Sequence, residues 1–386
     1  MNRIALKMLM GDRAKYFGIV IGITFASFLI TQQLAIFVGL MGRTVGFLSD
    51  TGQGDIWVMD SKVQFIDDIK PLQDTELYRV RGITGVQWAL PIYKGLSKAR
   101  LDNGNFQTCN IVGLDDSTLM GGPPEMLEGK LEDLRKADGI IVDENGAIGK
   151  LAKQPKERGG TPVPLKVGDT IELNDHRAIV VGICRVSRTF QSQPFIYTTY
   201  SRATTFAPKE RKLLSFILVK ANEGQPIDEL CARIRSETGL EAKTTQSFKE
   251  TTVSYFMKYT GIPINFGIAV VLGFLVGTAI AGQTFYNFTL DNLKYFGALK
   301  AMGASNFTLL RMILLQSLTV GAIGYGLGVG MAAFVGFAAR NTELAFLLPW
   351  QLLVITAAAV LLICALTSML SLYKVFRLEP AIVFKS

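Results

Sequence analysis

The sequence predicts an α-helical membrane protein with four transmembrane helices and a large mixed α/β extracytoplasmic domain between helices 1 and 2. Four stretches contain no Asp, Glu, Lys or Arg: residues 16–42, 259–290, 312–339 and 344–373. A helix needs roughly 20 apolar residues to cross the hydrocarbon core, so each stretch is long enough to span it. Most charged residues of the 386-residue chain lie between the first and second stretches.

The distribution of basic residues predicts how the chain is oriented in the membrane. The formal net charge is +8, yet residues 43–258 hold 29 basic and 28 acidic residues. The two ends and the loop 291–311 hold ten Lys and Arg against three acidic residues. Because cytoplasmic loops are enriched in Lys and Arg, we expect both termini in the cytosol and residues 43–258 in the periplasm of a bacterial inner membrane. The charge excess therefore reflects topology, and no nucleic-acid partner is expected.

The uncharged stretches also set the expected domain boundaries. Residues 1–15 are expected to form a cytosolic amphipathic helix on the surface of the lipid bilayer, because apolar side chains recur on one face. They are Ile4, Ala5, Met8 and Leu9. The other boundaries are 16–42 (first span), 43–258 (periplasmic α/β domain), 259–290 (second span), 291–311 (cytosolic coupling helix), 312–339 (third span), 340–348 (short external loop), 349–373 (fourth span) and 374–386 (cytosolic tail).

Alternating apolar residues and turn signals predict strands and helices within the periplasmic domain. Two hairpins are expected, one around Asn103-Gly104 and one around Asn174-Asp175, because these residues accept positive φ. A helix over 226–238 should end at Gly239. Further strands are expected at 54–59, 140–142 and 216–219, and a further helix from about residue 247.

The four cysteines give little guidance. Cys109, Cys184 and Cys231 fall in the periplasmic domain, where they allow at most one internal disulfide, and Cys364 falls in the fourth span. We favour four free thiols. None of the four is spaced as part of a metal site.

Two features of the sequence argue against an energy source within this chain. They contain no charged residue and no His that could carry a coupling ion. The chain also lacks the G-x-x-x-x-G-K-[ST] loop that binds ATP. We therefore expect no catalytic residue, no metal and no cofactor in this chain, and an energy source in another protein.

Two polar or small-residue patterns in the spans have competing explanations. A polar cluster in the first span could line a dimer seam or contact cargo, although ordinary hydrogen bonding between helices is favoured. A glycine run in the third span is expected to allow close helix packing. The cluster consists of Thr24, Ser27, Thr31, Gln32 and Gln33, and the run of Gly321, Gly324, Gly326, Gly328 and Gly330.

The loop between the second and third spans carries the most informative motif. Apolar residues at helical spacing, Leu293, Phe296 and Leu299, predict a ridge that a groove in a partner protein could bind. An interfacial helix that only satisfies topology is the alternative. Residues 295–305 read YFGALKAMGAS, which resembles the coupling helix of macrolide-exporter and lipoprotein-release ABC permeases, E-F-G-x-L-K-A-[ML]-G-A-S. The resemblance implies an ATPase contact through Leu293, Lys294, Phe296, Gly297, Leu299, Lys300, Met302 and Gly303.

Two other segments resemble the same mechanotransmission (type VII) family. The first span contains GIVIGI at 18–23, similar to the family's G-I-x-I-G-[IV]. Near the end, a segment resembles the R-L-[DE]-P-x-x-A tail that forms a second ATPase contact. Tyr295 departs from the pattern, because it replaces the usual acidic residue and offers no carboxylate for a salt bridge. The tail residues are Arg377, Leu378, Glu379 and Pro380.

The resemblance implies a function and a set of partners. No ATP-binding domain is fused to the chain, so a separate ABC ATPase would bind ATP and Mg²⁺, as in the permeases of cyanobacterial heterocyst glycolipid exporters, which this chain most resembles. Two copies would move a periplasmic or outer-leaflet amphiphile into a membrane-fusion adaptor and an outer-membrane channel. An ATPase-coupled regulator of cell-wall hydrolases, without cargo, is the alternative. A receptor without an ATPase is a third possibility. The sequence does not identify the cargo.

Overall fold

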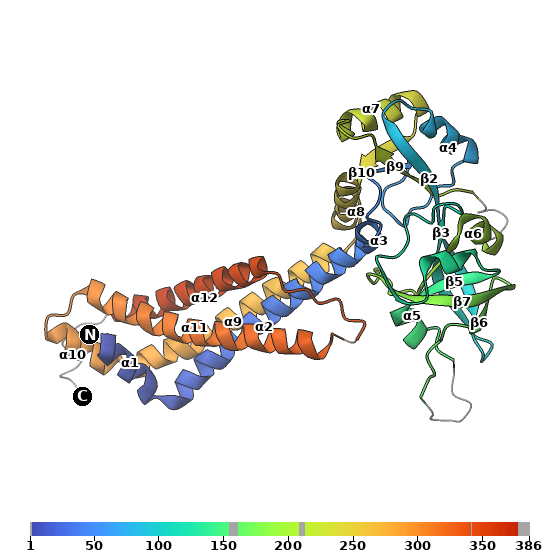
Figure 1. Ribbon diagram of the computed structural model, residues 1–386. Helices are drawn as coiled ribbons and strands as arrows, with labels where there is room; N and C mark the ends of the chain where they lie inside the picture. Colours follow the sequence, from blue (N-terminus) through green and yellow to red (C-terminus); the bar gives the residue numbers. More distant parts are fainter. Residues whose placement is uncertain (1, 154–160, 208–212, 341, 377–386) are drawn as a thin grey trace. The chain divides into compact units, whose positions relative to one another are not determined.

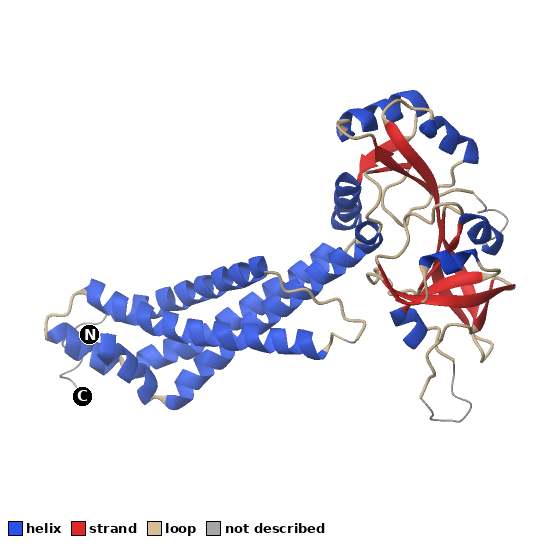
Figure 2. Cartoon of the chain, in the orientation of Figure 1, coloured by secondary structure: helices blue, strands red, loops and turns tan. Residues whose placement is uncertain are grey.

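The computed structural model describes residues 2–153, 161–207, 213–340 and 342–376. The chain forms two compact units, one of residues 1–40 with 261–386 and one of residues 41–260. Figures 1 and 2 show that the first unit is helical and that the second combines strands with helices. Each unit is described by itself.

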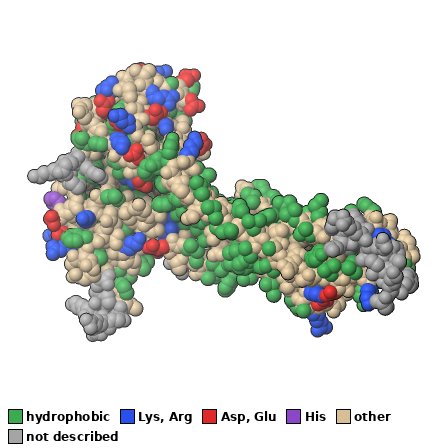
Figure 3. Space-filling view, turned by 180° about the vertical axis from the view of Figure 1, so that it is seen from behind, with side chains coloured by type: hydrophobic (Ala, Val, Ile, Leu, Met, Phe, Trp, Pro, Cys, Tyr) green, Lys and Arg blue, Asp and Glu red, His purple; other side chains and the backbone are tan. Residues whose placement is uncertain are grey.

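The helical unit has the four long helices that the uncharged stretches predict. Four of the described helices are long and apolar enough to cross a membrane. Figure 3 shows hydrophobic side chains over the surface of this unit, as expected for a surface that faces lipid. Its helices are α1 (Asn2–Gly11), α2 (Arg13–Thr44), α9 (Ile262–Asp291), α10 (Leu293–Ala301), α11 (Asn306–Ala338) and α12 (Trp350–Phe376).

The amino-terminal helix differs from its expected form. The helix predicted over residues 1–15 is interrupted at Asp12, where α1 has ended and α2 begins. Two residues of its apolar stripe, Ala5 and Leu9, are fully buried in the core of the helical unit, whereas Ile4 is exposed. The Nε2 of Gln316, in α11, donates a hydrogen bond of 2.8 Å to the carbonyl oxygen of Ala5. The bundle therefore covers part of the predicted stripe, and the position of this helix on the bilayer surface stays a prediction.

Glycines bring the long helices into close contact. A Cβ on Gly277 of α9 would lie 2.2 Å from the Cβ of Ala26 in α2. In α11, a Cβ on Gly328 would lie 2.6 Å from the Cβ of Ser27 and 2.7 Å from the backbone nitrogen of Phe28. Small residues at such seams let backbones approach closely within a membrane. The predicted packing role of the glycine run is confirmed at Gly328, whereas a Cβ at Gly326 would meet open space.

We expect Gly328→Ala to destabilise the bundle by about 1–3 kcal/mol, because the added methyl group meets backbone and Cβ atoms that cannot move aside. The matched control is Gly326→Ala, two residues earlier in the same helix, where nothing lies within 4 Å of the added methyl. Thermal unfolding in detergent should show a lower Tm for Gly328→Ala and no loss for Gly326→Ala. Equal Tm values would contradict the seam.

The second unit is built on a ten-stranded sheet with the order β10-β1-β9-β2-β3-β8-β5-β7-β4, while β6 pairs with β2 and β7. Its strands are β1 (Ile56–Met59), β2 (Val86–Arg100), β3 (Phe106–Leu114), β4 (Glu125–Glu128), β5 (Gly139–Asp143), β6 (Thr170–Leu173), β7 (His176–Arg185), β8 (Phe195–Thr199), β9 (Phe216–Ala221) and β10 (Glu241–Thr244). Its helices are α3 (Gly46–Asp50), α4 (Asp74–Arg81), η1 (Leu131–Arg135), α5 (Glu144–Ile148), α6 (Tyr200–Phe206), α7 (Ile227–Thr238) and α8 (Thr245–Tyr259).

Local sequence signals position several of these elements as expected. The hairpin between β2 and β3 turns at Gly104, which has a φ of +82°. The hairpin between β6 and β7 turns at Asn174 and Asp175, with φ values of +47° and +65°. Gly239 ends α7 in the left-handed conformation, at a φ of +76°. Both predicted hairpins and the helix end are confirmed, and all four cysteines are free thiols.

An aromatic cluster connects the two segments that lead into the first two spans. The ring of Trp57, in β1, lies 5.9 Å from that of Phe47 in α3 and 6.2 Å from that of Phe248 in α8. Along the chain, α3 follows α2 and α8 precedes α9. Both segments therefore pack against one fully buried tryptophan in the sheet.

A buried carboxyl group holds three elements of the sheet together. Asp143 is 5% exposed at the end of β5. Its carboxylate accepts hydrogen bonds from the backbone nitrogen of Gly146 in α5 (2.9 Å) and of Phe195 in β8 (2.7 Å). Burial raises the pKa of Asp143 to about 6, even though these hydrogen bonds oppose the shift.

This shift predicts a pH dependence of stability. Because the folded pKa is the higher one, the native state binds the proton more tightly than the unfolded chain does. The resulting stability is present at low pH and is lost as the pH rises from 3.8 to about 6, by up to about 3 kcal/mol. The Tm of the wild type relative to that of Asp143→Asn, which cannot titrate, should fall over this range. A constant difference would contradict the raised pKa.

Candidate functional site

The candidate coupling helix is the short helix α10 between α9 and α11. The Asn292 side chain donates a hydrogen bond of 2.8 Å to the carbonyl oxygen of Phe288 in α9. At the other end Gly303 adopts a φ of +93°, and the Oγ of Ser305 accepts a hydrogen bond from the backbone nitrogen of Thr308. Glycine thus ends one helix and serine caps the next.

The apolar ridge of α10 faces its own bundle. Phe296 is fully buried and Leu299 is 8% exposed, both within the core of the helical unit. Leu293 is half-buried against the same core. The expectation that these side chains present an outward ridge is therefore wrong, because they pack into a core to which α1, α2, α9, α11 and α12 also contribute. Spacing predicted a shared face but not the neighbour that covers it.

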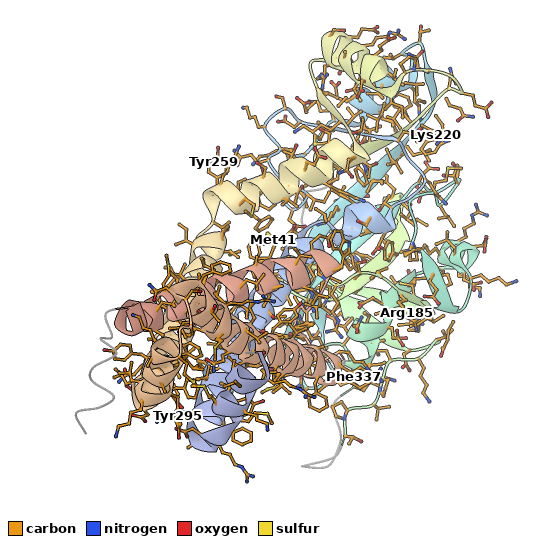
Figure 4. All side chains as sticks on the ribbon, turned by 90° about the vertical axis from the view of Figure 1, so that its left-hand side faces the viewer. Met41, Arg185, Lys220, Tyr259, Tyr295 and Phe337 are labelled. Atoms are coloured by element: carbon orange, nitrogen blue, oxygen red, sulfur yellow. The ribbon has the colours of Figure 1, made fainter. Side chains whose placement is uncertain are left out.

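The exposed face of α10 and of the following turn is made of other residues. Tyr295 is 62% exposed and Met302 is 75% exposed. Phe307, in the first turn of α11, is 73% exposed. Figure 4 labels Tyr295 on the helical unit. We call Tyr295, Met302 and Phe307 the turn face.

The remaining candidate residues of the motif divide between the two environments. Lys294 and Gly303 are exposed, Lys300 is half-buried and Gly297 is buried. Sequence reasoning did not single out Tyr295 and Phe307 as exposed residues of this turn. The available signals were Tyr295, an aromatic residue where the family has an acidic one, and Phe307, an aromatic residue shortly after the helix-capping Ser305. Arg377, Leu378, Glu379 and Pro380 lie outside the described residues.

Two residues of the polar cluster in the first span form hydrogen bonds within one chain. The Ser27 hydroxyl donates to the carbonyl oxygen of Tyr325 in α11 at 3.3 Å, and that of Thr31 donates to the Thr356 hydroxyl in α12 at 3.2 Å. Both residues are buried. Hydrogen bonding between helices, the favoured alternative, therefore accounts for Ser27 and Thr31. Thr24, Gln32 and Gln33 are half-buried.

Within the part of the chain that the structure describes, no group of three or more His, Cys, Asp and Glu residues is arranged to hold a metal ion. The candidate site is the surface of α10 and of the turn that follows it. Its parts are a buried ridge that fixes α10 to the bundle and an exposed turn face.

Comparison with known families decides the class of protein. The MacB-like periplasmic core domain family matches residues 16–237, more than half of the chain. The FtsX-like permease C-terminal family matches residues 267–380, which include α10 and its turn. This chain is an ABC transporter permease of the MacB/FtsX type. The predicted class and the predicted fold, four apolar helices with a MacB-like α/β domain after the first, are confirmed.

A curated relative and two solved structures resemble the permease. An uncharacterised ABC transporter permease of Methanocaldococcus jannaschii is 26% identical over 182 residues, 44% of this chain and 45% of the relative. The chain thus spans about half the length of that relative. The periplasmic region of MacB from Actinobacillus actinomycetemcomitans is 18% identical, covering 52% of this chain and 93% of that one, with a TM-score of 0.36. The extracellular domain of YknZ from Gram-positive bacteria is 11% identical, covering 50% and 98%, with a TM-score of 0.34.

Family membership bears on catalysis and location. ABC permeases of these families are generally non-catalytic transmembrane subunits, and the family together with the four apolar helices indicates an inner-membrane protein with a periplasmic domain. These family matches do not distinguish heterocyst glycolipid exporters from other members of the family.

Neighbouring residues of α10 should respond differently to truncation. We expect Phe296→Ala to destabilise the permease by about 3–5 kcal/mol, because the lost ring leaves a cavity in the core. Tyr295→Ala removes an exposed ring and should change stability by no more than about 0.5 kcal/mol. Thermal unfolding of both purified variants measures the difference. If Phe296→Ala were as stable as Tyr295→Ala, the inward orientation of the ridge would be refuted.

Proposed function

We propose that the permease transmits the motion of a separate ABC ATPase, docked on the turn face, to its periplasmic domain. This motion drives export of an amphiphilic cargo taken from the periplasm or from the outer leaflet. The ATPase binds ATP and Mg²⁺, and the permease contributes no catalytic group. A second copy of the permease, a membrane-fusion adaptor and an outer-membrane channel complete the assembly.

The exposure of the turn face is the observation that carries this proposal. Tyr295, Met302 and Phe307 lie in the segment that the basic residues predict to be cytosolic. Large apolar side chains that stay exposed in water mark surfaces for binding partners. The buried ridge supports the same role, because it joins α10 to the bundle so that a push on the turn face reaches the long helices.

The route toward the periplasmic domain follows the chain. Helix α2 leads directly into α3, and α8 leads into α9. Within the periplasmic unit, Phe47 of α3 and Phe248 of α8 both pack on Trp57. A movement of either long helix therefore acts on the same strand of the sheet.

The composition of the spans supports mechanical work rather than a polar conduit. None of the four uncharged stretches offers a charged residue to a hydrophilic solute crossing from the cytosol. A cargo that enters from the periplasmic side needs no such path. If the resemblance to heterocyst glycolipid exporters holds, that cargo is a glycolipid.

The proposal predicts that a double variant of the turn face, Met302→Asp with Phe307→Asp, releases the ATPase. Two carboxylates on a surface that must be desolvated should lower the amount of ATPase that copurifies by at least about tenfold. The Tm should stay close to that of the wild type, because both side chains are exposed. Quantitative mass spectrometry of the detergent-purified complex measures both ATPase and permease.

The matched control is Phe106→Asp, which changes an exposed aromatic residue of β3 in the periplasmic domain. It should leave ATPase copurification unchanged. Full retention of the ATPase in the double variant would place the docking surface elsewhere. A wild-type permease that purifies without any ATP-binding subunit would favour a receptor, and a bound cell-wall hydrolase in place of an adaptor would favour regulation without cargo.

A further inference from the structure

We propose that the ATPase-docking surface includes the amino-terminal helix α1, which faces α10 across a preformed cleft. This inference rests on the proposed function and extends it, because it adds a second permease element to the contact. The occupant is a segment of the ATPase that inserts an apolar side chain between the two helices, with charged groups beside it.

The cleft is a cavity of about 500 Å³ at the end of the helical unit that carries α1 and α10. Helix α1 lines it with Ile4, Lys7 and Met8, and α10 lines it with Tyr295. Ile4 is 45% exposed and Tyr295 is 62% exposed. Two apolar side chains thus stay accessible in one cavity.

The α1 side of the cleft is held firmly in place. Ala5 and Leu9 are fully buried, and the Gln316 amide binds the carbonyl oxygen of Ala5 at 2.8 Å. The bundle therefore already covers Ala5 and Leu9 of the apolar stripe of α1. Ile4 and Lys7 are left to contact something else.

An ion-pair cluster closes the base of the cleft. The Nζ of Lys15 lies 2.9 Å from the Asp12 carboxylate and also pairs with Asp291. The hydrogen bonds from Lys15 hold the pKa of Asp12 below its usual value. This cluster joins the start of α2 to the end of α9, next to the start of α10, and so fixes the two walls relative to each other.

The charges of the cleft argue against an anionic lipid as its occupant. Lys7 and Lys15 are balanced by Asp12 and Asp291, so the lining carries no net positive charge. Clusters that bind anionic headgroups hold an excess of Lys and Arg. A protein segment with an apolar residue and charged neighbours matches both the apolar walls and the mixed charges.

Continuity with the turn face identifies the ATPase as that protein. Tyr295 belongs to both surfaces, because it lines the cleft and lies on the exposed side of α10. A partner seated on Met302 and Phe307 would reach the cleft along the same helix. One continuous contact would then grip α1, α10 and the start of α11 together.

The test compares Ile4→Glu with Met10→Glu in the permease co-expressed with its ATPase. Both residues are exposed apolar side chains of α1, but Met10, at 65% exposure, does not line the cleft. Ile4→Glu should reduce copurifying ATPase by at least about tenfold, whereas Met10→Glu should change it by less than about twofold. Retention of the ATPase by Ile4→Glu, with loss in the Met302→Asp, Phe307→Asp variant, would overturn the α1 contact and leave the proposed function standing.

Photocrosslinking keeps the test decisive if Ile4→Glu disturbs folding. A benzoylphenylalanine at position 4 of the assembled complex in nanodiscs should form an adduct with the ATPase subunit, and one at position 10 should not. Mass spectrometry of the adduct identifies the partner. An adduct with phospholipid at position 4, or equal ATPase adducts at both positions, would overturn the proposal.

Discussion

The close approach of α2 to its neighbours is the constraint on which the helical unit depends. Lipid tails are as apolar as leucine side chains, so burying apolar surface does not by itself hold helices together in a membrane. Contact must therefore come from dense packing. Gly277 and Gly328 allow it, because they have no side chain and let the helix backbones approach closely. A hydrogen bond from Ser27 adds to the contact with α11, and one from Thr31 joins α2 to α12. The helices that pack on α2 are thereby fixed along its length.

The tight packing of the bundle bears on the coupling role that we propose for α10. With Phe296 and Leu299 inside the core, α10 is part of the bundle rather than an appendage attached by loops. A force applied to Met302 then acts on a packed unit, and packed interiors transmit strain because they deform little. The ion pair between Lys15 and Asp291 likewise joins the start of α2 to the end of α9, next to α10.

Elements fixed by local chemistry were the ones that the sequence predicted well. Uncharged stretches gave the four long helices, and Asn174 and Gly239 marked a hairpin and a helix end through their positive φ values. The β2–β3 pairing is the predicted hairpin, but the sheet order as a whole was not predictable, because pairings such as that of β2 with β9 join residues far apart along the chain. Periodicity likewise found the apolar faces of α1 and α10 but not that each packs on the bundle.

The inward direction of the ridge also changes how a family motif is interpreted. Phe296, Leu299 and Gly303 satisfy the motif, yet the first two are packing residues and the third ends a helix. Such positions determine the shape of α10 and leave the choice of partner to exposed neighbours. Tyr295, where this chain departs from the pattern, is one of those neighbours. Under the proposed function, replacing a carboxylate with an aromatic ring exchanges a salt bridge for an apolar contact, and we infer an ATPase whose matching surface is apolar at this position.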